Sequence, residues 1–451
     1  MQVLKSKILL GFSVLMLGLT SCHDDVSFDQ DTYDTLVQLS FPVQNIDPNH
    51  DWSTIGSATV SLTVNSETGT TFQVRIYEEN PIGHQGALTK LGEGIVAGNE
   101  TAAIRFSYRL AQPSAYVALF DPDNYMTVYP VTIKDGSASV VIQMPAPGEG
   151  TPVSQLQEKP LSFRYCFEDN FPEAGDYDFN DCVFTVTPQL DAQDAKKVTV
   201  TVSLDAVGTQ KCISGAIRLV GITDAMLNGK QCTRHFTDAA YPYSDNQNIP
   251  DGDFTTSSDR HNGDNSSVVM LLFKDAHWSM NPVGTSNTAV KRVFYNTMKN
   301  PDETGENLPA KTATYVFYFK SADNAKKMLE QSVYDAFLIT SNNGVPWEIH
   351  GVQNGRKGAL VLHADVHTDY ERYTNAYVNP ATSKSGKYSW AVMVPATMRY
   401  PIEGQAIGGR NRDSNAIEGA YKKAGHSFAE WAENRKNATD WYLYPDADLV
   451  Y

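Results

Sequence analysis

Residues 167–181 read FEDNFPEAGDYDFND, and the rest of the chain can be placed around this stretch. It holds six acidic side chains in fifteen residues, between two apolar runs at 161–166 and 182–186 that have the composition of β-strands. Carboxylates at this density repel one another unless a cation joins them. Calcium takes about six to eight oxygen ligands from Asp, Glu, Asn and backbone carbonyl groups. The stretch therefore predicts a calcium-binding loop that is held at both ends by strands.

The candidate ligands are the loop side chains with carboxylate or amide oxygens: Glu168, Asp169, Asp176, Asp178, Asn180 and Asp181. The spacing Asp176-x-Asp178-x-Asn180 matches the first three ligand positions of an EF-hand loop. The sixth position is Asp181 rather than Gly and the twelfth is Thr187 rather than Glu, so an EF-hand is excluded. A solvated acidic turn is the alternative to a metal site. Three aromatic side chains interleave with the acids, which favours a loop packed against the domain.

The same residues carry a resemblance to a family. FED, the proline that follows and GDYDFND resemble the signature that opens the LruC domain of secreted and lipid-anchored bacterial proteins. Later blocks resemble that family in the same order, namely WEIH at 347–350, YSWA at 388–391, YPIE at 400–403 and FAEWAE at 428–433. The resemblance runs from residue 161 to the C-terminus and implies a β-rich domain of unknown role. It also leads us to expect small or apolar residues in relatives where this chain has Cys166 and Cys182.

The first residues have the pattern of an export signal. Two lysines precede an apolar run at residues 8–19, which is shorter than the roughly twenty residues that a membrane-spanning helix needs. Residues 19–22 read LTSC and resemble a lipobox, which predicts cleavage after residue 21 and lipidation of Cys22; an ordinary signal peptide is the alternative. Several acyl chains would anchor the protein stably to a membrane. We expect the outer membrane, and the acidic residues after Cys22 favour exposure at the cell surface.

Strand and linker patterns predict the organisation of the chain. Residues 58–64 and 71–77 alternate apolar and polar side chains, the period of a half-buried strand, and the linker is rich in Pro, Gly and polar residues. The expected fold class is mainly β, with two β-sandwich-like domains. The second domain is expected to be larger and to carry long loop insertions, such as 233–265, and a few short helices. The expected parts are a signal peptide at 1–21, a lipidated N-terminus and tether at 22–49, a small β-sandwich domain at 50–147, a linker at 148–160 and an LruC-like domain at 161–451.

Four cysteines remain besides the lipidated one. An even number in an exported protein permits two disulfides, with three connectivities. The pairs closest in sequence, Cys166–Cys182 and Cys212–Cys232, are the candidates, and buried free thiols are the alternative. The cysteines show none of the Cys/His spacings that are typical of zinc or redox sites.

Charge and motifs limit the classes of function. A formal net charge of −16 repels nucleic acid and attracts divalent cations. The sequence contains no phosphate loop, dinucleotide fingerprint, zinc-protease motif or nucleophile elbow. Glu348 and His350 lie two residues apart, so they share one face of a strand. They are a candidate second site, as a ligand pair or a proton-transfer pair, and a structural pair is the alternative.

The sequence predicts a lipid-anchored protein of the cell envelope with a calcium-stabilised β-rich domain. We expect a non-catalytic module that binds a glycan or protein partner at the cell surface, in adhesion or as a structural subunit. The alternative is a surface glycan-degrading hydrolase that uses a carboxylate pair, such as Glu168 with Asp176 or Glu348 with Glu403. A deep cleft between two carboxylates would favour the hydrolase, whereas a shallow aromatic face would favour binding.

Overall fold

The computed structural model describes residues 42–451 with gaps, and residues 41–451 belong to one compact unit. The residues left out within this range are 44, 67–68, 144–149, 154–155, 171–174, 229–231, 237–253, 257–266, 282–289, 343–344, 352–376, 379–386 and 412. The expected signal peptide, the expected lipidation site Cys22 and most of the polar insertion at 233–265 lie outside the described residues.

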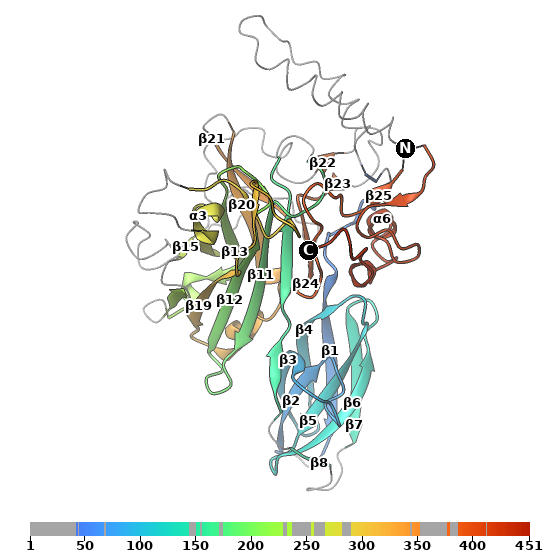
Figure 1. The fold of residues 1–451 in the computed structure, drawn as a ribbon. Coiled ribbons are helices and arrows are strands. Elements are labelled where there is room, and N and C mark those ends of the chain that lie inside the picture. Colours follow the sequence, from blue (N-terminus) through green and yellow to red (C-terminus); the bar gives the residue numbers. More distant parts are fainter. Residues whose placement is uncertain are drawn as a thin grey trace, which may run out of the picture. The chain divides into compact units, whose positions relative to one another are not determined.

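The first group of strands forms two sheets around a shared core (Figure 1). One sheet has β1 (Ile55–Asn65) between β4 (Thr101–Arg109) and β7 (Ser137–Gln143). The other has the order β8-β6-β5-β2-β3-β9, with β2 (Thr71–Tyr77), β3 (Leu88–Ala97), β5 (Ser114–Phe120) and β6 (Tyr125–Thr132) at its centre. The predicted alternation is confirmed, since Leu62 and Val74 from opposite sheets are buried in one core. The sandwich is not wholly antiparallel, however, because β7 pairs with β1 in parallel.

The segment predicted to be a linker contributes two short strands to this group. β8 (Thr151–Pro152) pairs with β6, and β9 (Glu158–Pro160) pairs in parallel with β3. The Glu158 carboxylate accepts hydrogen bonds from Arg75 Nη1, at 3.0 Å, and from the Tyr77 hydroxyl. Residues 158–160 are therefore fastened to the sheet.

Two further sheets pack face to face in the larger part of the chain. The first has the order β14-β19-β12-β11-β10-β24 and comprises β14 (Thr233–Phe236), β19 (Lys311–Tyr318), β12 (Lys197–Ala206), β11 (Cys182–Leu190), β10 (Phe163–Phe167) and β24 (Ala391–Pro395). The second has the order β15-β16-β13-β20-β21 and comprises β15 (Phe254–Thr256), β16 (Ser267–Phe273), β13 (Ser214–Thr223), β20 (Tyr334–Asn342) and β21 (Val345–His350). The Tyr165 hydroxyl of one sheet donates to the Tyr334 carbonyl oxygen of the other at 2.8 Å. The prediction of a mainly β protein with a second, larger sandwich is confirmed.

The helices are few and short, as expected. They include α3 (Ala276–Met280), α4 (Ala322–Lys327) and α6 (Phe428–Glu433). A capping box at Ser427 and Glu430 begins α6, and Phe428 and Trp431 of this helix are fully buried. In the part of the chain that the structure describes, no helix has both the length and the apolar character to cross a membrane.

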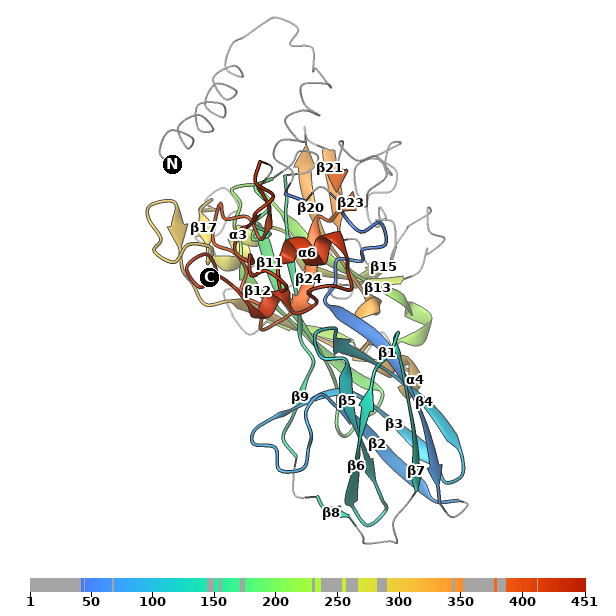
Figure 2. The ribbon, with the colours of Figure 1, turned by 90° about the vertical axis from the view of Figure 1, so that its right-hand side faces the viewer.

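Residues 42–54 pack against the C-terminal segment, which we define as residues 396–451. His50 Nε2 lies 3.0 Å from the Trp431 carbonyl oxygen, and the Trp52 and Trp431 rings meet edge to face at 5.8 Å between centroids. Figure 2 shows the C-terminal segment in red, with α6 as its clearest regular element. The chain entering β1 is therefore held by the end of the same chain.

The two predicted disulfides do not form, because all four described cysteines are free. In the β10–β11 register, Cys166 lies opposite Val183 and Cys182 opposite Phe167. Neighbouring residues on a strand point to opposite faces of the sheet, so the two thiols face away from each other. Cys212 and Cys232 have different partners, the Asp275 carboxylate and the Tyr318 amide respectively.

Candidate metal centre

The acidic loop, residues 168–181, connects β10 to β11, which are adjacent antiparallel strands. Phe167 and Cys182 are partners in the register, so the two ends of the loop lie side by side. The Asp169 amide donates to Asp181 Oδ2 at 2.7 Å, and the Glu168 amide donates to the Trp390 carbonyl oxygen at 2.9 Å. The base of the loop is therefore fixed by the sheet.

Three of the six predicted ligands come together. One carboxylate oxygen each from Glu168, Asp176 and Asp178 lie within 4.8 Å of one another. Glu168 is fully buried and its Oε1 accepts a bond from the Phe179 amide at 2.7 Å, whereas Asp176 lies at the exposed rim. These three carboxylates can share one cation.

The other three predicted ligands have different partners. Asp169 Oδ1 lies 3.1 Å from the Lys211 ammonium group, which also reaches Asn170. Asp181 accepts the Asp169 amide, and the Asn180 side-chain amide donates to Asp178 Oδ2 at 2.9 Å. These residues lie around the group of three in the structure, and the contacts named here engage only some of their polar atoms.

Several buried oxygens of this loop lack a hydrogen-bond donor. Glu168 Oε2, Asp169 Oδ2 and Asn180 Oδ1 are buried and accept no hydrogen bond from any described residue. A buried polar atom without a partner costs about 1–3 kcal/mol. All three atoms are acceptors, so the group that would satisfy them must be positively charged or carry donor hydrogens, as a cation or a water molecule does.

The electrostatics of the cluster favour a bound cation. Burial raises the pKa of Glu168 well above its usual value, and the Asp176 carboxylate adds to the rise. Burial also raises the pKa of Asp178, with contributions from Asp176 and Glu168. These groups are therefore unfavourable as isolated anions, and a divalent cation would stabilise their charged form.

The loop backbone adopts a conformation that bulky residues rarely take. Tyr177 has a φ of 60° and Phe179 a φ of 54°, both in the left-handed region. Packing holds them there, since Phe179 is fully buried and the Tyr177 carbonyl oxygen accepts a bond from the Ile407 amide at 2.7 Å. Gly175 fits beside this turn because a Cβ there would lie 2.0 Å from Glu168 Oε2.

Gly208 is a second position at which the loop allows no side chain. Its amide donates to the carbonyl oxygens of Asn180 and Asp181, and a Cβ would lie 2.0 Å from Asn180 Oδ1 and 2.7 Å from the Asn180 carbonyl oxygen. We expect Gly208→Ala to destabilise the protein by about 1–3 kcal/mol, because the backbone on one side must move. Urea unfolding measures the change, and a midpoint equal to that of the wild type would contradict this packing.

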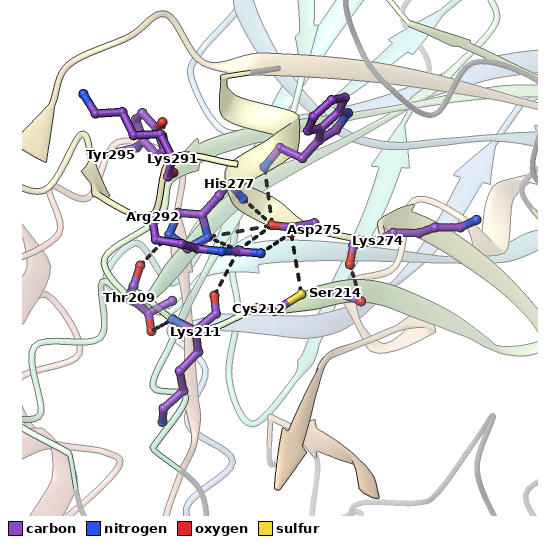
Figure 3. Close-up of polar contacts among 11 residues, drawn as sticks. Thr209, Lys211, Cys212, Ser214, Lys274, Asp275, His277, Lys291, Arg292 and Tyr295 are labelled. Carbon is purple, nitrogen blue, oxygen red and sulfur yellow. Dashed lines mark hydrogen bonds and ion pairs between the residues drawn. The ribbon is translucent and has the colours of Figure 1, made fainter. Parts of the chain in front are cut away.

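A polar cluster holds the chain segment that carries Lys211 (Figure 3). Arg292 makes two contacts with the Asp275 carboxylate, at 2.8 and 2.5 Å, and its Nη1 lies 2.9 Å from His277 Nδ1. His277 Nε2 lies 2.6 Å from the Thr209 carbonyl oxygen, so Nε2 carries the proton and Nδ1 accepts from Arg292. The pKa of His277 is lowered to about 4, mainly by burial and secondly by the positive charge of Arg292. Both ring nitrogens are engaged, and the cluster positions residues 209–212 against the acidic loop.

The predicted pair Glu348 and His350 lies in a buried ionic network. His350 Nδ1 is 3.0 Å from Asp335 Oδ1, and its Nε2 is 3.2 Å from Glu348 Oε2. Arg218 Nη2 lies 2.7 Å from Asp335 Oδ2. Burial alone would lower the pKa of His350, but the two carboxylates outweigh it and raise the pKa to about 9. Two cations and two anions therefore balance, which favours the structural interpretation of the pair.

Sequence reasoning did not find the partners of these groups. Asp335 and Arg218 face each other across β20 and β13, and the Asp275, His277 and Arg292 cluster joins residues far from Thr209 in the sequence. None of these spacings forms a motif. Glu403, considered only as a partner of Glu348, instead accepts a bond from the Thr297 hydroxyl at 3.2 Å and lies near the acidic loop, where Asp176 affects its pKa.

Comparisons with known proteins give a family but no activity. One similar solved structure is the crystal structure of a provisionally named lipoprotein from Bacteroides ovatus. The match covers 84% of this chain and 98% of the Bacteroides ovatus chain, with 14% identity and a TM-score of 0.49. The full-length major pilin SpaD of Corynebacterium diphtheriae is 10% identical, with 68% of this chain and 67% of the pilin covered and a TM-score of 0.14. Both scores are too low to support an inference, and a search of curated proteins found no match. A family model matches residues 193–442, more than half of the chain, and the protein therefore belongs to the family described as "Domain of unknown function (DUF4842)".

Proposed function

We propose that this protein is a lipid-anchored component of the cell envelope, of the LruC-domain type, whose larger β-rich part is stabilised by calcium. The lipobox-like LTSC at residues 19–22 supports lipidation at Cys22. We propose the outer membrane as the location, because residue 23 is His rather than the Asp associated with retention at the inner membrane. The FED and GDYDFND blocks support the LruC assignment, and they precede the span that the family model matches.

The observation that carries the calcium proposal is the set of buried oxygens without donors in the acidic loop. Glu168, Asp176 and Asp178 would hold the ion, since their oxygens already converge. Calcium suits this site better than magnesium, because it accepts irregular oxygen shells, whereas magnesium requires a near-ideal octahedron and keeps its waters. The ion would be structural: it would join carboxylates that otherwise repel one another.

The role we propose is non-catalytic, in binding, adhesion or the structure of the envelope. A glycoside hydrolase needs two carboxylates that flank a sugar ring. Glu168 and Glu348 are both fully buried, and Glu348 is engaged with His350. Neither residue can meet a glycan in this arrangement, which favours a binding or structural role over the hydrolase. A glycan or a protein at the cell surface is the proposed partner.

Calcium should therefore raise the thermal stability of the protein that begins at residue 22. At about a hundred times its dissociation constant, calcium adds about 2.7 kcal/mol to the native state. We expect a clear rise in melting temperature when calcium replaces excess chelator, and a smaller rise with magnesium. Asp176→Ala/Asp178→Ala should lose the rise. An equal response of the double variant would place calcium elsewhere, and no response of the wild type would remove the proposal.

A further inference from the structure

We propose that β7 is an interaction surface at which a second copy of this chain adds its own β7, so that two three-stranded sheets join into one. The inference goes beyond the proposed function and rests on neither the calcium site nor the lipid anchor. Three observations carry it: the open backbone edge of β7, the absence of charge along it, and the exposure of Val141.

β7 is the last strand of the sheet β4-β1-β7 and pairs there only with β1, in parallel. The Thr59 amide donates to the Gly136 carbonyl oxygen at 2.9 Å, and Thr59 lies beside Ser137 in the register. In a parallel pair with this bond, the backbone groups of residues 138, 140 and 142 point toward β1. Those of Ser139, Val141 and Gln143 point away from β1, and no described residue forms a hydrogen bond with them. Three consecutive positions of the ladder are therefore open.

An open edge pairs readily with another strand, and proteins usually protect edges with charges, prolines, short strands or a covering segment. The other edges of the four large sheets carry such protection in the described residues. β14 and β15 are only four and three residues long, and the β24 edge is covered by residues 52–54, since the Met393 amide donates to the Trp52 carbonyl oxygen at 2.9 Å. The remaining edge strands contain a charged residue or a proline: Arg105 in β4, Pro152 in β8, Pro160 in β9 and Pro346 in β21. β7 reads SASVVIQ and has neither.

The absence of charge favours a second copy as the partner. The whole chain has a net charge of −16, yet none of the 11 residues of β1 and none of the 7 residues of β7 is charged. In a two-fold pair the same surface meets itself, so every charge near the axis would face a like charge. Val141 is 61% exposed, one of four large hydrophobic side chains that the described chain leaves exposed. A neutral edge with an exposed valine therefore fits its own copy, whereas a strongly charged partner would find no opposite charge on it.

Antiparallel pairing about a two-fold axis at Val141 uses all three open positions. Val141 of one copy then faces Val141 of the other, and Ser139 faces Gln143. Each facing pair can exchange two hydrogen bonds, and β-branched side chains pair favourably across strands. The joined sheet has the order β4-β1-β7-β7-β1-β4. Such an interface closes on itself, so it produces a dimer rather than a fibre.

Sedimentation velocity over a range of protein concentrations tests this pairing. The protein from residue 23 is used with a reducing agent, because it lacks the Cys22 thiol and cannot form a dimer linked through that residue. We expect the wild type to dimerise, and Val141→Lys and Val141→Glu each to raise the dissociation constant about tenfold or more, because like charges would face each other. An equimolar mixture of the two variants should associate again, since Lys would then face Glu.

Ala103→Lys is the matched control. Ala103 and Ser139 both lie beside Ser61, so Ala103 is on the same exposed face of the sheet, but in β4 rather than at the β7 edge. This variant should dimerise as the wild type does. Dissociation equal to that of Val141→Lys would show a general effect of charge and contradict the assignment of the interface to β7.

The other outcomes decide as follows. A wild type that stays monomeric at every concentration, a Val141→Lys variant that dimerises as tightly as the wild type, or a mixture of folded Lys and Glu variants that stays monomeric would each overturn the proposal. If circular dichroism shows that the charged variants are unfolded, hydrogen exchange of the wild type at low and high concentration decides instead. Slower exchange of the Ser139, Val141 and Gln143 amides at high concentration would support the pairing, and exchange that does not depend on concentration would exclude it.

Discussion

Asp335→Ala is expected to destabilise the protein by about 3–5 kcal/mol, because it removes one member of a buried ionic network and leaves its partners uncompensated. Asp335 is buried and lies 3.0 Å from His350 Nδ1 and 2.7 Å from Arg218 Nη2. Urea unfolding at pH 7 in saturating calcium measures the loss. The large value arises from the two positive charges that remain in the core, rather than from the strength of one ion pair.

A matched surface variant sets the scale for that loss. Asp191 pairs with Lys197 at 2.7 Å, but both side chains are partly exposed. Such pairs contribute roughly 1 kcal/mol or less. Asp191→Ala should therefore change the free energy of unfolding only slightly. If Asp335→Ala were as mild as Asp191→Ala, the network would not be the buried charged cluster that the structure describes.

The stability of the protein should also fall between neutral and alkaline pH through His350. Its pKa is about 9 in the folded protein, above the usual value of 6.5. Because the folded pKa is the higher one, the stabilisation is fully present below about pH 6.5 and is lost as the pH rises through about 9. The full difference corresponds to about 3 kcal/mol.

The pH profile of His350→Gln isolates this effect from other titrating groups. The variant should be less stable than the wild type at pH 6, and the difference between the two should shrink by about 3 kcal/mol by pH 9.5. Saturating calcium in both samples keeps the acidic loop in one state. A difference that does not change with pH would show that His350 is neutral in the folded protein, in conflict with its position between two carboxylates.

Local sequence patterns indicate the secondary-structure elements that depend on neighbouring residues alone. Val198, Val200, Val202 and Leu204 alternate with polar residues, and β12 buries all four. Ser427 and Glu430 form a capping box, a motif that depends on four consecutive residues alone. The acidic loop likewise follows from two apolar runs around a dense acidic stretch, although only three of its six candidate ligands converge.

Contacts between distant residues set the limits of prediction from sequence. The parallel pairing of β7 with β1 depends on the path of the whole sandwich, and the local alternation of a strand does not specify the direction of its partner. The predicted link between Cys166 and Cys182 was wrong because the register, and not the sequence spacing, decides which faces the thiols occupy. Gly404 meets Asp178 only because the C-terminal segment returns to the acidic loop.

Equilibrium dialysis tests the central claim most directly, by counting the calcium ions bound per chain. The protein from residue 22 and its Asp176→Asn/Asp178→Asn variant would be dialysed against micromolar calcium in excess magnesium. We predict one tightly bound calcium ion in the wild type and none in the variant, both remaining folded. Absence of bound calcium in the wild type, or undiminished binding in the variant, would contradict the assignment of the acidic loop as a calcium site.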